Sequence, residues 1–380
     1  MIKQLRISKV ILAFLLVLLT LTSCTKPDSA TQGNSAVRVG AILPLTGPTS
    51  YLGEDERLGI ELALASRQNS NPKIEFIFED SQGKSDLALS AMRKLIDVNK
   101  TSIFVVTTTT PVLATLPAFQ ESGKDVLVFS QAMIPEVTKG YPFAFRVYAT
   151  SDEETDLTSA YAKEKGYKRF AALHIANRFG EEGINYFSRK VKSNGGEVVI
   201  NESFQFTDTD YRTVLTKIKQ LNPDAIAIYA YSTNYPLIFR QMEEIGLNIP
   251  VLGNADLALG GLQDKISSSF LERVVFPAPY YYVSQNDAQV LDFNQKVRAK
   301  GKAPNFDIGY SYDSTMILIR AIEQTNSSDP SVLKQYLLKM EPYKGVTGTI
   351  KLNEERDTRA DMQLVRWGQN GVEVVWQRPQ

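Results

Sequence analysis

The sequence has very little of the two residues that most often carry metal and thiol chemistry. Its 380 residues include one cysteine, Cys24, and one histidine, His174. These counts exclude His-rich and cysteine-based metal sites, and a lone cysteine has no partner for an intrachain disulfide. His174 lies in the apolar run Ala-Ala-Leu-His-Ile, so we interpret it as a packed strand residue. A Ser-His-Asp triad would need this one histidine, and there is no Gly-x-Ser-x-Gly motif to supply its nucleophile.

Other motifs are missing as well. The chain has no Walker A sequence and no Gly-x-Gly-x-x-Gly after its first predicted strand, which argues against a nucleotide site. The 42 basic and 42 acidic residues give a formal net charge of zero, and removing residues 1–23 leaves 39 against 42. A mildly acidic chain without a basic patch is a poor candidate for a nucleic-acid partner. Carboxylate pairs are numerous but none stands out as a glycosidase pair, so we expect no enzyme activity, no catalytic residues, no metal and no cofactor.

The first 36 residues read as an export signal followed by a tether. Residues 1–9 are basic, and residues 10–19 are apolar but too few to span a bilayer. Residues 21–24 (LTSC) resemble a bacterial lipobox, which makes residues 1–23 a signal peptide and Cys24 the lipidated residue. Residues 24–36 then form a flexible tether. The protein would be exported and lipid-anchored at the cell envelope, on a periplasm-facing leaflet or the outer face of the plasma membrane. The alternative is a plain signal peptide with an incidental cysteine.

After the tether, strand and helix patterns alternate, which predicts parallel sheets covered by helices on both faces. Two such series indicate two doubly wound lobes, and the rhythm changes after Val274. Strands are expected at residues 37–43, 74–78, 103–106, 126–129, 170–173, 198–200, 225–229 and 250–252, then at 346–351, 362–366 and 373–375. Helices are expected from residue 54 and at residues 87–98, 112–120, 152–165, 181–192, 211–220, 235–245, 288–299, 311–324 and 331–340.

Several short segments, in order, carry a resemblance to a known family. They are VGAILPLTG at 39–47 with Gly53, EDSQG at 79–83, Phe145-Arg146, Arg178-Phe179-Gly180, IGYSYD at 308–313 and GVTG at 345–348. With a lipobox in front, the chain resembles the solute-binding proteins of ABC importers for branched-chain amino acids, the type I periplasmic binding proteins. The resemblance runs from Val37 to about Val375.

The resemblance implies an α/β fold of two doubly wound parallel-sheet lobes, joined by three hinge crossings near Phe145, Phe276 and Gly345, that close on a ligand. The implied lobes are residues 37–145 with 277–344, and residues 146–276 with 345–380. The implied function is a receptor, monomeric, that delivers a small polar solute, such as an amino acid or a related carboxylate or amide, to the membrane subunits of an ABC transporter.

The run of four threonines at 107–110, followed by Pro111, is the strongest candidate for ligand contact. It ends a strand and opens a helix, where backbone N–H groups and hydroxyls converge at the carboxyl end of a parallel sheet. The resemblance implies that Thr109 binds a ligand carboxylate, with Thr108 and Thr110 as neighbouring contacts. An ordinary helix cap is the alternative.

The resemblance implies further ligand contacts at Tyr51, Leu52 and Phe179, although Phe179 could equally serve in helix packing. More tyrosines are candidates: Tyr229, Tyr231, Tyr280, Tyr281, Tyr282, Tyr310 and Tyr312.

At two places the sequence departs from the residues with which the family's amino-acid binders hold the carboxylate and the ammonium of their ligand. Residues 130–134 (SQAMI) stand where the family's amino-acid binders have Ser-Pro-Ala-Ala/Gly-Thr, so Ile134 replaces the threonine that helps to bind a carboxylate, and Ala132 and Met133 are the candidate contacts of this segment. Asp256 is one position displaced from the acid that pairs with an ammonium. An interaction lipoprotein that regulates an envelope enzyme and binds no ligand is therefore the alternative function.

Overall fold

The computed structural model describes residues 36–67, 71–259, 265–279, 286–368 and 371–376. The predicted signal peptide, Cys24 and all but the last residue of the predicted tether lie outside the described residues. None of the helices in these ranges is both long and apolar enough to cross a bilayer.

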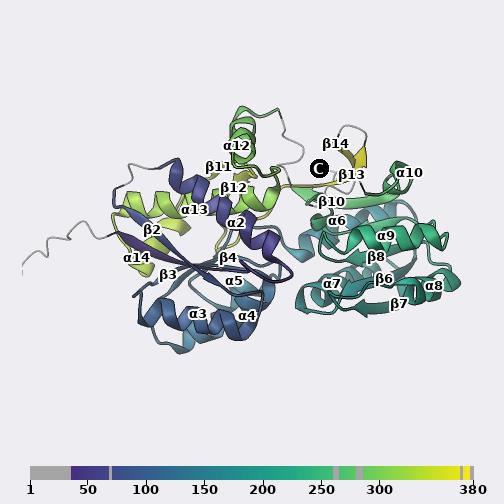
Figure 1. Cartoon of the computed structure of the whole chain (residues 1–380), viewed down its shortest axis with the longest axis horizontal. Coiled ribbons are helices and arrows are strands. Elements are labelled where there is room, and N and C mark those ends of the chain that lie inside the picture. Colours follow the sequence, from purple (N-terminus) through teal and green to yellow (C-terminus); the bar gives the residue numbers. More distant parts are fainter. Residues whose placement is uncertain (1–35, 68–70, 260–264, 280–285, 369–370, 377–380) are drawn as a thin grey trace, which may run out of the picture. The chain divides into compact units, whose positions relative to one another are not determined.

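The first sheet has five parallel strands in the order β2-β1-β3-β4-β5 (Figure 1). They are β1 (Val37–Leu43), β2 (Ile74–Asp80), β3 (Ile103–Thr107), β4 (Leu127–Gln131) and β5 (Ala144–Arg146). The helices between them are α2 (Ser50–Ala65), α3 (Ser85–Asp97), α4 (Thr109–Glu121) and α5 (Glu136–Gly140).

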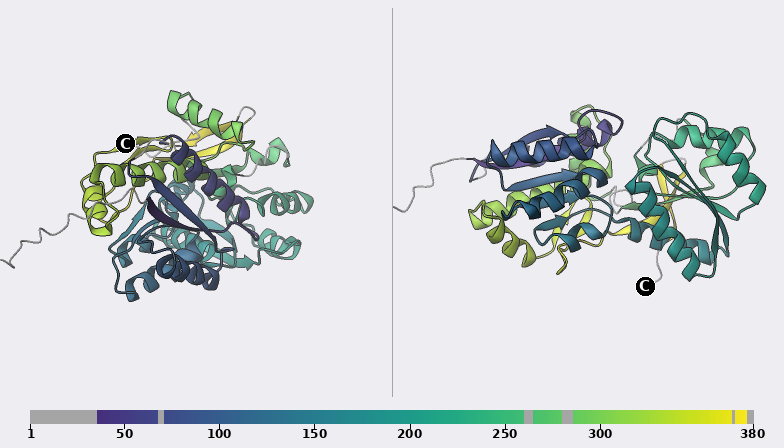
Figure 2. Two further views of the ribbon diagram at one scale, coloured as in Figure 1. Left: turned by 60° about the vertical axis from the view of Figure 1, so that its left-hand side comes forward. Right: turned by 90° about the horizontal axis from the view of Figure 1, so that it is seen from below.

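Both faces of this sheet are covered, because successive side chains of a strand point to opposite faces. In β3, Ile103 and Val105 pack in the core that includes α2, and Phe104 and Val106 pack against α3 and α4. Two later helices, α13 (Phe306–Thr325) and α14 (Pro330–Leu338), join the α2 side (Figures 1 and 2). The continuous apolar runs of the predicted strands follow from this double burial.

The second sheet has seven strands in the order β14-β13-β10-β9-β8-β6-β7. Its parallel part is β6 (Arg169–Ile175), β7 (Glu197–Phe204), β8 (Ala225–Tyr229), β9 (Val251–Gly253) and β10 (Val274–Pro279), and the last two strands, β13 (Met362–Gly368) and β14 (Gly371–Trp376), add antiparallel. Its helical segments are α6 (Ser151–Glu164), α7 (Arg178–Ser193), α8 (Arg212–Leu221), α9 (Tyr235–Glu244), η1 (Ala255–Ala258) and α10 (Ser268–Leu271).

The chain passes between the two sheets three times: after β5, after β10 and again before β13. The second passage leads to α12 (Ala288–Ala299), α13 and α14, and a short hairpin follows, made of β11 (Tyr343–Gly345) and β12 (Gly348–Ile350). The predicted fold class of two doubly wound parallel-sheet lobes is confirmed.

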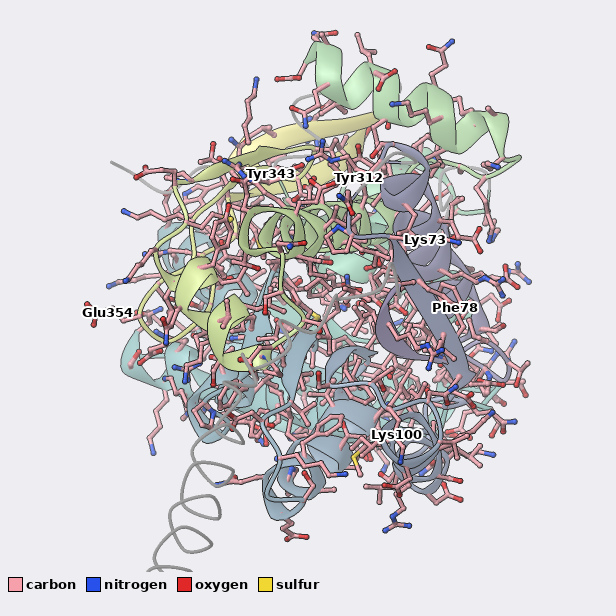
Figure 3. The ribbon with its side chains drawn as sticks, turned by 90° about the vertical axis from the view of Figure 1, so that its left-hand side faces the viewer. Lys73, Phe78, Lys100, Tyr312, Tyr343 and Glu354 are labelled. Atoms are coloured by element: carbon pink, nitrogen blue, oxygen red, sulfur yellow. The ribbon has the colours of Figure 1, made fainter. Side chains whose placement is uncertain are left out.

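The predicted strand at 346–351 is confirmed only over β12 (Gly348–Ile350), since Val346 and Thr347 form the turn of the β11–β12 hairpin. Asp313 of α13 accepts hydrogen bonds from the backbone N–H groups of both residues, at 3.0 and 2.8 Å. A Cβ at Gly345 would lie 2.3 Å from the Asp313 carboxylate, so this close approach requires glycine. Tyr343 of the hairpin lies close to Tyr312 of α13, as Figure 3 shows.

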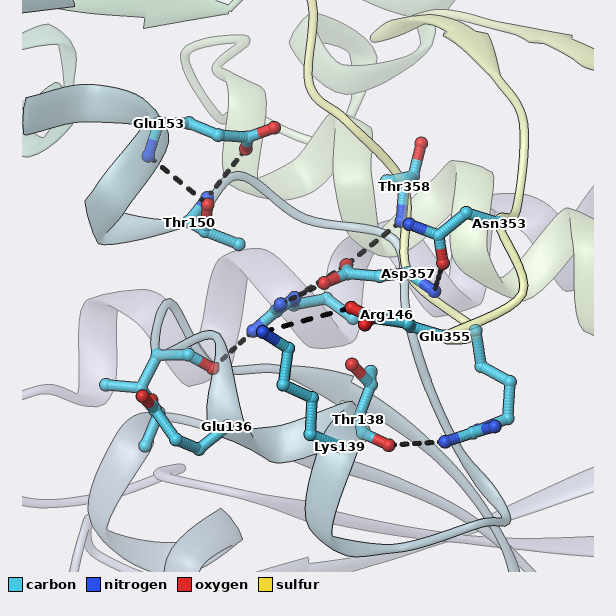
Figure 4. A network of polar contacts seen from close by, with 12 residues as sticks. Glu136, Thr138, Lys139, Arg146, Thr150, Glu153, Asn353, Glu355, Asp357 and Thr358 are labelled. Atoms are coloured by element: carbon cyan, nitrogen blue, oxygen red, sulfur yellow. Dashed lines mark hydrogen bonds and ion pairs between the residues drawn. The ribbon is translucent and has the colours of Figure 1, made fainter. Parts of the chain in front are cut away.

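Two of the connecting segments are tied together by Arg146, whose side chain is fully buried (Figure 4). Its guanidinium forms a two-point ion pair with Asp357, which lies between β12 and β13. The same guanidinium donates to the carbonyl oxygens of Ala132 and Ile134. One side chain thereby satisfies acceptors from the end of β4 and from the third passage.

We predict that Arg146→Met lowers the free energy of unfolding by about 3–5 kcal/mol, because it leaves the Asp357 carboxylate and two carbonyl groups without their partner. Urea denaturation followed by circular dichroism measures the change. Arg169→Met is the matched control: its pair with Glu197 is exposed, so the loss there is at most about 1 kcal/mol. Equal losses in the two variants would contradict this account.

Candidate ligand-binding site

The loops that form the candidate site leave both sheets at their topological switch points. In the first sheet the strand order reverses between β1 and β3, and in the second between β6 and β8. Open α/β sheets bind ligands in the crevice outside the carboxyl ends of strands at such points. The helices that follow β1, β3 and β6 are α2, α4 and α7.

A pocket of about 40 Å³ lies where these loops meet. That volume holds only a few water molecules, so a larger solute enters only if the pocket widens. The pocket is lined by Leu52, Glu56, Thr108, Thr109, Gln131, Met133, Tyr148, Phe179, Tyr231, Asp256 and Asp307. Phe179, Tyr231 and Asp256 follow strands of the second sheet, and the others come from the first sheet, its helices and the first connecting segment.

The threonine run ends β3 and begins α4 at the pocket wall. Thr108 has φ 61° and ψ 145°, a conformation that costs a residue with a side chain on the order of 1–3 kcal/mol. Its hydroxyl donates to the Thr107 carbonyl at 2.7 Å. Thr109 is the first helical residue, and the first N–H groups of a helix have no acceptor within it. This corner therefore offers the pocket a small set of hydrogen-bond donors.

Glu56 lies one helical turn after Leu52 on α2 and lines the pocket, and α2 packs tightly on α13. A Cβ at Gly59 would lie 2.5 Å from the Ile308 carbonyl oxygen. The Ser311 hydroxyl donates to the Glu56 carbonyl at 2.8 Å, and the Thr107 hydroxyl donates to the Glu56 carboxylate at 2.7 Å. Burial, and then the neighbouring Asp307, raises the pKa of Glu56 well above its ordinary value.

Asp307 comes from the first turn of α13, which Asn305 caps by accepting from the Ile308 N–H at 3.1 Å. The Tyr148 hydroxyl donates to one Asp307 oxygen, and the other oxygen has no hydrogen-bond partner among the described residues. Burial raises the pKa of Asp307 to about 7, against the opposing effect of the Tyr148 hydrogen bond. This carboxyl is therefore half protonated near neutral pH.

The second sheet contributes an acid and two aromatic rings. Asp256 lies in η1 and is buried; burial, and then the charge of Asp307, raises its pKa well above the ordinary value. Phe179 and Tyr231 stack with their ring centroids 5.2 Å apart. Asn177 caps α7 by accepting from the Gly180 N–H at 3.1 Å and donates to the Tyr231 hydroxyl at 3.2 Å. The cap thereby fixes both rings at the pocket.

Most of the residues predicted from the sequence lie together in this pocket: Leu52, Thr108, Thr109, Met133, Phe179, Tyr231 and Asp256. Their role in ligand binding stays a prediction.

Three predicted residues do not line the pocket. Ala132 points to the opposite face of the first sheet, among the residues that pack against α3 and α4. Thr110 is half-buried in the next position of α4. Tyr51 stands just outside, with its buried hydroxyl within electrostatic reach of Asp256 and Asp307.

Of the remaining tyrosine candidates, two pack against residues of the pocket and one packs elsewhere. Tyr310 packs on Tyr148 with a centroid distance of 4.8 Å, and Tyr229 packs on Phe179 at 6.4 Å, so both support pocket residues. Tyr312 packs on Phe293, away from the pocket. Tyr280, Tyr281 and Tyr282 lie outside the described residues.

The sequence reasoning missed Glu56, Gln131, Tyr148 and Asp307. Two of these had a usable signal. Glu56 follows Leu52 by four residues and so shares its helix face. Gln131, the last residue of β4, precedes Met133 by two residues, so continued strand alternation places these two on one side and Ala132 on the other.

The family described as periplasmic binding protein matches residues 36–372. The chain belongs to that family. The periplasmic binding protein family is one of exported, extracytoplasmic solute-binding receptors, not enzymes, so the expectation of a binder without enzymatic activity is confirmed.

Individual periplasmic binding proteins are similar over nearly the whole chain. A protein named Leu/Ile/Val-binding protein homolog 3, from Brucella melitensis, is 22% identical and covers 89% of this chain and 93% of its own length. A crystal structure of a leucine-binding protein from Thermotoga maritima superimposes with a TM-score of 0.81 at 24% identity, over 90% of this chain and 98% of that one. A solute-binding protein from Rhodopseudomonas palustris, in complex with 3,4-dihydroxybenzoic acid, gives a TM-score of 0.78 at 21% identity, over 90% and 96%.

We predict that Asp307 makes the ligand-free protein less stable as pH rises from about 4 to 7. Its folded pKa is above its ordinary value, so the folded state keeps a proton that the unfolded state has lost. The free energy of unfolding of Asp307→Asn, relative to the parent protein, should rise by about 1.4 kcal/mol per pH unit across this range. Urea denaturation at pH 4.5 and 7 measures the difference, with the exposed Asp361→Asn as control. A difference that stays the same at both pH values would contradict the prediction.

Proposed function

We propose that this periplasmic binding protein is a lipid-anchored receptor that binds a small polar solute and delivers it to an ABC importer. The solute would be an amino acid or a related carboxylate or amide. The observation that carries the proposal is the pocket at both switch points, which joins residues of the first sheet to Phe179, Tyr231 and Asp256 of the second.

The known relatives support this solute class. The Brucella protein is named for leucine, isoleucine and valine, and the Rhodopseudomonas structure holds a benzoic acid. The N-terminus of α4, with Thr108 and Thr109, suits a carboxylate, because helix N-termini offer free N–H groups and positive potential. The alternative of an interaction lipoprotein that binds no solute is not favoured by these relatives.

In this proposal the two lobes, residues 37–145 with 277–344 and residues 146–276 with 345–380, close on the solute. A solute shifts the equilibrium toward the closed form only by contacts that exist in that form. Residues of both lobes line the pocket, so a solute held there would contact both and favour closure. The closed form would then be the one that the importer recognises.

We expect a thermal-shift screen of the chain from Thr25 onward to single out one class among amino acids, amides, small organic acids, polyols and nucleosides. A solute that binds only the folded state at a hundredfold excess over Kd adds about 2.7 kcal/mol of stability. Thr109→Val should weaken binding of a carboxylate-bearing solute about tenfold, because it removes a hydroxyl donor at the pocket.

Thr213→Val is the control for this screen, since Thr213 is exposed near the start of α8. Protein shown to be free of co-purified solute that responds to no class would overturn the receptor function and favour the interaction protein.

The proposed lipid anchor leads to a separate prediction. It concerns Cys24, which lies outside the residues that the structure describes. Cys24→Ser should move the full-length protein from the membrane fraction to the soluble fraction, because lipid chains contribute about 0.8 kcal/mol per buried CH₂ and a serine cannot carry them in this linkage. Fractionation and mass spectrometry of the N-terminal peptide measure the outcome. A variant that stays in the membrane fraction would show that the attachment does not depend on Cys24.

A further inference from the structure

The pocket acids lack the cationic partners that a neighbouring buried acid has. Asp55 precedes Glu56 on α2, and its carboxylate lies 3.2 Å from the Lys302 ammonium and accepts from Asn305 at 2.7 Å. Within the described residues, the hydrogen-bond partner of the Glu56 carboxylate is the Thr107 hydroxyl, and that of Asp307 is the Tyr148 hydroxyl. Buried carboxylates are normally paired with a cation. The pocket acids have no cation from the described residues that line the pocket, so a bound solute could supply it.

The acids are linked by pairwise electrostatic interactions that run from the first lobe to the second. Glu56 and Asp307 interact electrostatically, Asp307 interacts with Asp256, and Asp256 interacts with Glu154 behind it. Glu154 is fully buried, and one of its oxygens accepts from the Ala255 N–H at 3.1 Å. None of the described residues that line the pocket is a lysine, an arginine or a histidine. The pocket therefore becomes strongly negative when its acids ionise.

Free hydrogen-bond acceptors point to the same chemistry. One Asp307 oxygen and the Gln131 Oε1 are buried without a partner among the described residues. The Gln131 amide nitrogen donates to the Ser314 hydroxyl at 3.4 Å, which directs its oxygen away from Ser314. A buried acceptor without a donor is costly, so these two oxygens favour a solute that brings N–H groups.

The second sheet adds an aromatic wall next to the acids. The stacked rings of Phe179 and Tyr231 line the same pocket as Asp256. The face of an aromatic ring attracts ammonium and guanidinium groups. The wall and the acids therefore favour the same charge.

We propose that the solute of this receptor is an organic cation whose ammonium or guanidinium group is held by Glu56 of α2 and Asp307 of α13 in the first lobe and by Asp256 of η1 in the second. Glu56 and Asp307 determine the specificity for the cation. This inference rests on the proposed receptor function and goes beyond its solute class, because it requires a cationic group and no carboxylate. A benzoate, such as the one in the Rhodopseudomonas structure, would face three carboxyl groups in this pocket.

The protonation state of the acids predicts how the affinity for the solute changes with pH. Asp307 is faced by Asp55 and Glu56 of α2, by Asp256, and by the tyrosines Tyr51, Tyr148 and Tyr310. None of these groups supplies a positive charge, and burial raises the pKa of Asp307 to about 7. A cation binds the ionised carboxyl, so its affinity rises with pH. An anion would instead accept from the protonated acids, and its affinity would fall with pH.

Isothermal titration calorimetry on protein dialysed free of bound solute tests the proposal with 1,4-diaminobutane, arginine, lysine, leucine and benzoate at pH 6 and pH 8. We expect at least one of the three cations to bind, with an affinity that rises by up to about tenfold per pH unit for each proton released. Glu56→Gln and Asp307→Asn should each weaken that binding by about ten- to a hundredfold. Glu54→Gln removes an exposed charge from the same helix and should leave the affinity unchanged.

Binding of leucine or benzoate but of no cation, unaffected by Glu56→Gln and Asp307→Asn, would overturn the cation class and leave the receptor function standing. Failure of every probe, together with failure of the broader solute screen, would overturn both. Circular dichroism checks that each variant folds. If a variant does not fold, the pH dependence of the parent protein tests the proposal instead. An affinity for the cation that falls from pH 6 to pH 8 would contradict it.

Discussion

The close packing of α2 on α13 is the contact on which the rest of the structure depends. Helix α2 follows the first strand of the chain, whereas α13 comes after the chain has built most of the second sheet and returned. Gly59 permits the approach, and the Ser311 hydroxyl bonds the backbone of α2 at Glu56. The same contact completes the core of the first sheet and places Glu56 beside Asp307. Packing and pocket electrostatics therefore have one origin.

The sequence predicted the larger features because hydrophobic periodicity and strand–helix alternation are local signals. Both doubly wound sheets follow from them, as does the threonine corner after β3. The predicted strand at 346–351 took in the turn of the hairpin and missed β11, because that turn is stabilised by Asp313, a residue more than thirty positions away. Asp307 was missed for the same reason, whereas Glu56 had a local signal in its four-residue spacing from Leu52 on α2. Their proximity results from the α2–α13 packing, which no local pattern encodes.

Burial of the pocket acids shows how a binding site differs from a core. A stable core pairs each buried charge, as Lys302 does for Asp55, or binds it with backbone donors, as the hairpin does for Asp313. Glu56 and Asp307 each have a hydroxyl as their partner within the described residues, and Thr108 adds a strained backbone at the same place. Such unfavourable terms are tolerated where surrounding structure imposes them, and they concentrate where a protein binds something else.

The three passages between the sheets also set the order in which the molecule is completed during synthesis. The strands β6 to β10 and their helices are contiguous in the sequence, so the parallel part of the second sheet needs no residue that follows it. The core of the first sheet cannot be completed before α13 is synthesised, and α13 leaves the ribosome more than one hundred and fifty residues after β5. Until then the face of the first sheet that α13 covers stays open, and exposed apolar surface of this kind promotes aggregation. Export of the unfolded chain would avoid that interval.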